Sequence, residues 1–141
     1  MTYTPITGDI IQELITICSL SNVITDRERI EGYSHDETSR EQFCAMPEVV
    51  VTPTTTGQVA QIMRLADRYT IPVTPRDAGS GLSGGAIPLF GGIVLSLEKM
   101  NRIIEVDEEN LTVTAEAGIV TNELNERLKD TGLFFAGYPM S

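Results

Sequence analysis

Apolar residues recur along this chain at the spacing of a helix in two long stretches. In the first, Thr7 stands where an N-cap is expected, and one helical face is formed by Ile10, Ile11, Leu14, Ile15 and Cys18. In the second, the capping box Thr55-x-x-Gln58 precedes an apolar face made of Val59, Ile62, Met63, Ala66 and Tyr69. The spacing therefore predicts two amphipathic helices.

Two further helices are predicted to be shorter. A capping box at 25–28 predicts one that continues through Ile30. Thr121, followed by two leucines four residues apart, predicts another that ends at Gly132. The polar stretch 32–43 has no period and is predicted to be an irregular connector.

Short β-branched runs mark three strands, at 49–51, 71–75 and 93–95. The first run has no polar alternation, which predicts a strand buried on both faces. The first two runs flank the second long helix. Residues 49–75 are therefore expected to form a strand, helix, strand unit with a right-handed connection.

After residue 96 the pattern changes to alternation. Ile104 and Val106 alternate with charged residues, a polar turn follows at 107–110, and apolar residues return at every second position from Leu111 to Ala115. This is the pattern of an antiparallel hairpin. Together with the earlier helices and strands, it predicts an α+β fold.

The two patterns divide the chain into two parts. We expect a small strand, helix, strand subdomain over 1–96 and the beginning of a second α+β subdomain over 97–141. The second part closes on the apolar run 133–135, and such side chains ordinarily pack under further residues. We therefore expect a fragment of a longer chain.

Composition narrows the class of partner. The chain carries 20 acidic and 10 basic side chains, a formal charge of −10. Binding to nucleic acid or to an anionic membrane needs clustered Lys and Arg, so neither is expected. No apolar run, including the largely apolar stretch 93–97, approaches the roughly 20 residues that span a bilayer. Without a targeting segment at the N-terminus, the cytoplasm is the expected compartment.

The sequence spells out no metal site and no catalytic cluster. Cys18 and Cys44 lack metal-ligand spacing and have no histidine pair beside them, so two free thiols are expected. His35 lies in the polar connector, and Asp107 opens an acidic turn. Solvated side chains are the expected state of both. The prediction is no catalytic residue and no bound metal in this part of the protein.

The stretch PRDAGSGLSGGAIP, residues 75–88, contains Gly79-x-Gly81-x-x-Gly84, the letters of a dinucleotide-binding fingerprint. A Rossmann loop must run straight into a helix, but Pro88 and two more glycines precede the next strand and leave no room for one. A Walker loop requires Lys and Ser or Thr after the last glycine, and neither follows here. The sequence therefore argues against both nucleotide-binding loops.

The four glycines and two serines of this loop still need an explanation. Glycines can direct successive N–H groups toward one point, and the missing Cβ atoms let a diphosphate approach the main chain closely. Arg76, at the start of the loop, can either pair with a phosphate or pack structurally against a carboxylate. The residues favour an anion-binding loop, with a tight surface turn as the alternative.

The sequence from PRDAGSGLSGGAIP through GGIVLSLEKMNRIIEVDEENLTVTAEAGIV resembles the FAD-binding domain of the vanillyl-alcohol oxidase/PCMH superfamily, and in particular the flavin subunit of D-lactate and glycolate dehydrogenases. The resemblance extends from about residue 33 to 141. It implies a PCMH-type α+β fold in which two subdomains enclose an extended FAD, with the glycine loop around its pyrophosphate. It also implies a separate cap domain, later in the chain, that carries the substrate site.

Carried over position by position, the resemblance implies two groups of cofactor-binding residues. The pyrophosphate would be lined by Pro75, Arg76, Gly79, Ser80, Gly81, Leu82, Ser83, Gly84 and Gly85. Gly118 in AEAGIV, and Pro139 with Ser141 in GYPMS, resemble segments that run near the flavin.

Three places depart from the family pattern: Asp77, where glycine is more usual, Ala117, where proline is common, and the tetrapeptide at 138–141. Asp77 would repel a diphosphate unless its side chain points outward or pairs with Arg76. Tyr138 would either stack on the flavin ring or cover the last apolar cluster.

The resemblance implies the FAD-binding part of a flavin-dependent 2-hydroxyacid dehydrogenase or oxidase, of the D-lactate or glycolate type, in which a hydride passes from the substrate α-carbon to FAD. An electron-transfer flavoprotein or an iron–sulfur protein would take the electrons. We expect the fragment alone to be inactive and to hold FAD weakly or not at all. The alternative is a free-standing, non-catalytic module that binds a nucleotide or phosphate.

Overall fold

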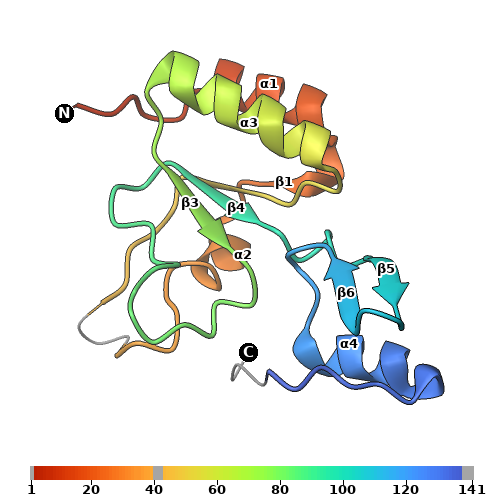
Figure 1. Ribbon diagram of the computed structural model, residues 1–141. Helices are drawn as coiled ribbons and strands as arrows, with labels where there is room; N and C mark the ends of the chain where they lie inside the picture. Colours follow the sequence, from red (N-terminus) through yellow and green to blue (C-terminus); the bar gives the residue numbers. More distant parts are fainter. Residues whose placement is uncertain (1, 40–42, 138–141) are drawn as a thin grey trace.

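The computed structural model describes residues 2–39 and 43–137. Within them the chain forms two parts, which Figure 1 shows: a four-stranded sheet with helices on its faces, then a two-stranded hairpin with one helix. The predicted α+β class is confirmed. In the part of the chain that the structure describes, no helix has the length and apolar character needed to cross a bilayer.

The strands of the first sheet lie in the order β1-β2-β4-β3. β2, β4 and β3 run parallel, and β1 pairs antiparallel with β2. Their bounds are Val23–Ile24 for β1, Val49–Val51 for β2, Val73–Arg76 for β3 and Ile93–Ser96 for β4. The three predicted strands are confirmed, and the last of them lies between the other two.

Helices α1, Gly8–Cys18, and α3, Thr56–Tyr69, cover one face of this sheet (Figure 1). Side chains alternate between the faces of a strand, so the odd-numbered residues of β2 and β4 meet these helices. The resulting core includes Leu14, Ile62, Val49, Val51, Ile93 and Leu95. All three residues of β2 are fully buried, as predicted.

Both long helices begin at their predicted caps. The side chain of Thr7 accepts the N–H of Ile10 at 3.4 Å, and that of Thr55 accepts the N–H of Gln58 at 3.2 Å. The predicted apolar face of α3 is wrong at Met63, which is 47% exposed. The buried face is instead centred on Ile62, Leu65 and Ala66.

The short helix α2, Arg27–Glu31, lies on the other face of the sheet, where Ile30 packs with Val50 and Val94. It begins one residue later than predicted. Asp26, and not Thr25, is the N-cap, and its carboxylate accepts the N–H of Arg29 at 3.0 Å. A short 3-10 turn, Leu20–Asn22, joins α1 to β1.

The second part begins after β4. Strands β5, Ile103–Asp107, and β6, Thr112–Ala115, pair antiparallel as predicted. Helix α4, Thr121–Leu128, follows and continues into a 3-10 turn, Lys129–Thr131. Gly132 ends the turn at φ 75°, a left-handed conformation that suits glycine.

Two details of this second part differ from the predictions. The residue before α4 is Val120, whose side chain makes no capping hydrogen bond, so Thr121 is the first helical residue and not a cap. Ile104 does not share a buried face with Val106, because the register shifts between Ile103 and Glu105 and leaves Ile104 66% exposed.

Candidate functional site

The glycine loop, defined here as residues 77–92, leaves the carboxyl end of β3 and returns at β4. It contains turns and bends but no helix, as the sequence predicts. Gly79 and Gly84 have positive φ, at 73° and 74°, where other residues are strained. The segment is therefore an irregular loop at the end of a parallel sheet, where α/β proteins commonly bind ligands.

Most amides of the glycine loop have no partner in the described structure. The N–H of Gly84 donates to the hydroxyl of Thr38 at 3.2 Å. Within the described residues, nothing accepts a hydrogen bond from the N–H groups of the segment 79–83, nor from Gly85 and Ala86. Unpaired main-chain donors that are close together form a ready site for an anion.

Gly81 and Gly85 have no structural reason to be glycine. Neither has a positive φ. A Cβ built at Gly85 meets no atom within 4 Å, and one built at Gly81 meets only Asp36 Oδ2, at 3.8 Å. The missing side chains leave open space beside the unpaired amides. This open cradle would accept a diphosphate at contact distance from the main chain.

Arg76 is engaged by the connector, defined here as residues 32–39. Its guanidinium donates to the carbonyl of His35 at 2.6 Å and to that of Gly32 at 3.3 Å, and it lies 5.7 Å from the centre of the Tyr33 ring. Arg76 packs structurally, but within the described residues its partners are main-chain carbonyls and not the carboxylate that the sequence suggested. A Cβ at Gly79 would collide with this guanidinium, so the Arg76 position itself requires glycine there.

Further contacts join the connector to the glycine loop. The N–H of Glu37 donates to the carbonyl of Gly81 at 3.1 Å, and the hydroxyl of Thr38 accepts a hydrogen bond from the N–H of Gly84. In Figure 1 the connector, drawn in orange, lies beside the green loop. Two irregular segments that are about 40 residues apart in sequence therefore hold each other in place.

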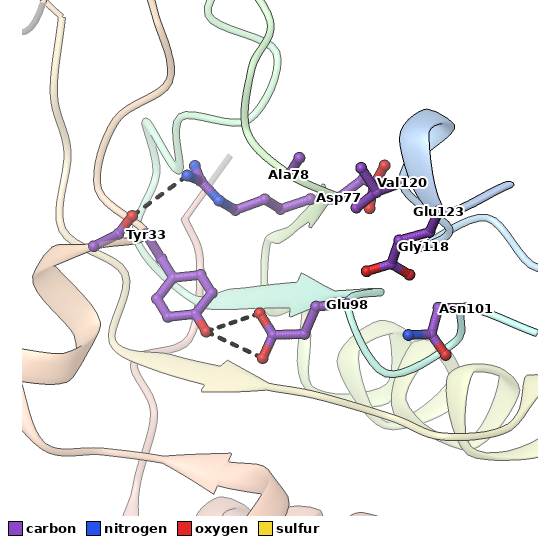
Figure 2. Close-up of a pocket in the computed structure, with 10 residues that line it drawn as sticks. Tyr33, Asp77, Ala78, Glu98, Asn101, Gly118, Val120 and Glu123 are labelled. Atoms are coloured by element: carbon purple, nitrogen blue, oxygen red, sulfur yellow. Dashed lines mark hydrogen bonds between the residues drawn. The ribbon is translucent and has the colours of Figure 1, made fainter. Parts of the chain in front are cut away.

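A cavity of about 380 Å³ lies between the two parts of the chain, next to the glycine loop. Figure 2 shows Tyr33 and Glu98 on one side of it and Asn101 and Glu123 on the other. The hydroxyl of Tyr33 donates to Glu98 at 3.2 Å. Burial, and then the Glu98 carboxylate, raise the pKa of Tyr33.

Asp77 also lines this cavity. Partial burial raises the pKa of its carboxyl group. It does not pair with Arg76 within the described residues, because that guanidinium is directed at the connector. The carboxylates of Asp77, Glu98 and Glu123 give the cavity wall a negative character, which suits hydroxyl groups of a ligand better than its phosphates.

Gly118 packs against the turn that follows β4. It lines the cavity and donates its N–H to the carbonyl of Met100 at 2.8 Å. A Cβ at this position would collide with the carbonyl oxygen of Leu97. Close main-chain packing accounts for this glycine, and a cofactor contact at Gly118 stays a prediction.

The structure brings most of the predicted site residues together. Pro75 and Arg76 end β3, and the predicted glycines, serines and Leu82 follow in the adjoining loop. Pro139, Ser141 and Tyr138 lie outside the described residues. The sequence reasoning missed the contribution of the connector. The signal available for it was Asp36-x-Thr38, a pattern typical of a side chain that caps its own turn.

Three comparisons relate this geometry to known proteins. The family described as FAD binding domain matches residues 47–141. Glycolate oxidase subunit GlcD of Bacillus subtilis is 35% identical over 96% of this chain and 28% of its own length. D-lactate dehydrogenase of Anaerostipes hadrus is 36% identical over 97% of this chain and 28% of its own length.

Among solved structures, p-cresol methylhydroxylase with substrate bound has a TM-score of 0.80 at 24% identity, over 94% of this chain and 27% of that chain. At this identity the match concerns the fold. The chain spans little more than a quarter of each of these longer proteins.

Proposed function

Because this chain belongs to the family of FAD binding domains and has the PCMH-type fold, we propose that it is the cofactor-binding part of a flavin-dependent 2-hydroxyacid dehydrogenase or oxidase. FAD is the cofactor of the family. The relatives named glycolate oxidase subunit and D-lactate dehydrogenase support a small 2-hydroxyacid, such as D-lactate or glycolate, as the substrate of the whole protein. We assign residues 1–96 and 97–141 to the two subdomains that enclose the cofactor.

The observation that carries this proposal is the open cradle of the glycine loop. Because the chain as a whole is acidic, a diphosphate would have to be held by local hydrogen-bond donors. The unpaired amides of the loop are such donors, and the empty space at Gly81 and Gly85 lets the diphosphate reach them. The residues that would line the pyrophosphate are Pro75, Arg76, Gly79, Ser80, Gly81, Leu82, Ser83, Gly84 and Gly85. Gly118, Pro139 and Ser141 would lie nearer the flavin.

Arg76 would act in this site without a direct hydrogen bond to the phosphates. Its guanidinium holds the connector, so its charge contributes to the field around the phosphates while the hydrogen bonds come from the main chain. The hydroxyl groups of the cofactor would face the acidic cavity beside Asp77 and Glu123. This division keeps the negative side chains away from the negative phosphates.

The chemistry that a bound flavin supplies is acceptance of a hydride from the α-carbon of the 2-hydroxyacid. This chain's residues would bind and orient the cofactor and shield one side of it from water. The base and the groups that bind the substrate would belong to other parts of the complete protein. We further propose a cytoplasmic enzyme that passes electrons to an electron-transfer flavoprotein or an iron–sulfur protein.

The test uses the complete natural protein. We expect it to purify with the absorption spectrum of a flavin, near one FAD per chain, and to reduce an artificial electron acceptor when given D-lactate or glycolate. A protein that binds FAD but oxidises no 2-hydroxyacid would contradict the activity and leave the cofactor assignment standing. A protein that binds free phosphate or nucleotides and no FAD would favour the non-catalytic module instead.

A further inference from the structure

Among the residues the structure describes, Asp36 is the one acidic or basic side chain that is buried, at 4% exposure. It lies in the middle of the connector, against the glycine loop. Its Oδ1 accepts the N–H of Thr38 at 2.8 Å, which closes a turn around Glu37. Hydrogen bonding from Thr38 lowers the pKa of Asp36, so the carboxylate is charged at neutral pH.

The second oxygen of the Asp36 carboxylate lies close to the glycine loop. Asp36 Oδ2 is buried and has no hydrogen-bond partner within the described structure. Nearly all buried polar atoms have a hydrogen-bond partner, so an open one calls for an explanation. Gly81 is the loop residue beside it, since a Cβ there would lie 3.8 Å from Oδ2. The carboxylate therefore presents an open acceptor beside the cradle.

The turn that Asp36 closes offers two groups to the loop. The N–H of Glu37, inside the turn, donates to the carbonyl of Gly81 at 3.1 Å. The hydroxyl of Thr38, at its end, accepts the N–H of Gly84 at 3.2 Å. Both contacts depend on the backbone direction that the carboxylate fixes.

The contact at Gly81 also sets the direction of the next amide. A trans peptide is planar, and its C=O and N–H point in opposite directions. With the Gly81 carbonyl held by Glu37, the N–H of Leu82 points away from the connector. The Leu82 amide has no partner among the described residues, and its side chain is 69% exposed. It is therefore a donor aimed outward before any ligand arrives.

We propose that Asp36 is a positioning residue for the cofactor: through Glu37 and Thr38 it holds the glycine loop so that the Leu82 amide and its neighbours face the diphosphate. This inference rests on the proposed function. Preset donors bind an anion more tightly than mobile ones, because the cost of ordering the loop has already been met during folding.

The experiment titrates FAD into the complete natural protein after its flavin has been removed. Asp36→Ala opens the turn, and Thr38→Val keeps the side-chain shape but removes the acceptor of the Gly84 amide. We expect Kd to rise about tenfold or more in the first and about fivefold in the second, the loss of one or two aligned hydrogen bonds. The ³¹P resonances of bound FAD should shift in both, because the donors around the diphosphate are displaced.

Asp107→Ala is the matched control. Asp107 also closes a turn, accepting the N–H groups of Glu109 at 3.1 Å and Asn110 at 2.9 Å, but it belongs to the hairpin and not to the connector or the loop. Its substitution should leave both Kd and the ³¹P resonances unchanged. Thr38→Val decides the question if Asp36→Ala fails to fold.

Three results would overturn the positioning role. One is unchanged FAD affinity in Thr38→Val, and another is an equal loss of affinity in Asp107→Ala. A third is weaker binding with unmoved ³¹P resonances, which would indicate a general loss of stability. A wild-type protein that binds no FAD would contradict the proposed function itself, and this is seen without any variant.

Discussion

Main-chain hydrogen bonding differs between the central strands, β2 and β4, and the glycine loop. In the strands every residue is buried, and the amides and carbonyls pair within the sheet. In the loop most amides are unpaired, and Gly81 and Gly85 leave open space where side chains would stand. The sheet takes its shape from its own apolar side chains. The loop takes its shape from a second irregular segment, the connector.

This difference separates stability from cofactor binding. Burial of apolar side chains stabilises the sheet, whereas unpaired donors and open space contribute nothing to folding. A change in the core should therefore alter the unfolding free energy, and a change in the cradle should alter FAD affinity. Four substitutions test this separation.

The largest expected effect is on the core. Ile62 is fully buried between α3 and the sheet, so Ile62→Ala should cost about 2–5 kcal/mol of unfolding free energy. Native-state hydrogen exchange at the amides of β2 and β4 in the complete protein would measure this loss. The protein that stays folded should bind FAD as the wild type does. A variant that lost FAD while its sheet amides kept full protection would contradict the separation.

The next largest effect is on the loop. Gly81→Val places a side chain in the cradle at a position without positive φ, where the new Cβ would only be in ordinary contact with Asp36 Oδ2, so the fold should tolerate it. FAD affinity should fall about 100-fold, because the main chain can no longer approach the diphosphate. Flavin fluorescence during titration of the complete protein measures the affinity. Equal flavin retention in Gly81→Val and Asp107→Ala would remove the loop from the cofactor site.

Arg76→Lys should affect both properties moderately. The ammonium group cannot span the carbonyls of His35 and Gly32 as the guanidinium does, so the connector loosens. We expect about 1–2 kcal/mol less stability and a severalfold weaker affinity for FAD. Thermal unfolding with and without FAD separates the two effects. Unchanged stability with a large loss of FAD would mean that Arg76 binds phosphate directly.

The smallest effect is a change in pH dependence. The pKa of Asp36 is lowered below its ordinary value of 3.8, so its ionised form stabilises the fold above that pH. The contribution is lost as the pH falls below 3.8 through the folded-state pKa. Asp36→Asn should therefore lower stability at neutral pH and have less effect in acid. Urea unfolding of both proteins at several pH values measures the difference in their unfolding free energies. A difference that stays the same from neutral to acidic pH would contradict the role given to Asp36.

The sequence predicts the sheet core well because burial leaves a local pattern. The run at Val49–Val51 and the faces of α1 and α3 follow from period and caps that a few neighbouring residues determine. The strand β1 and the placement of β4 between β2 and β3 are tertiary facts, since they depend on pairing with distant residues. The exposure of Ile104 was missed for the same reason, because the alternation of residue types does not reveal a register shift between paired strands.

The candidate site divides in the same way. The glycine loop is visible in the sequence because four glycines within seven positions are unusual, and the missing helix after it argues against a Rossmann loop. The role of Asp36 and Thr38 could not be predicted from the sequence, because polar residues are common in irregular segments and give no specific signal there. Their contacts with Gly81 and Gly84 join positions about 45 residues apart and follow from the fold alone.

The most direct measurement is amide hydrogen exchange of the complete protein, at single-residue resolution, with and without FAD. If the unpaired amides bind the diphosphate, those between Gly79 and Gly85 should exchange fast without FAD and become protected when it binds, while the buried amides of β2 change little. Amides in the glycine loop that remain unprotected in the flavin-loaded protein would contradict the claim that this loop holds the cofactor.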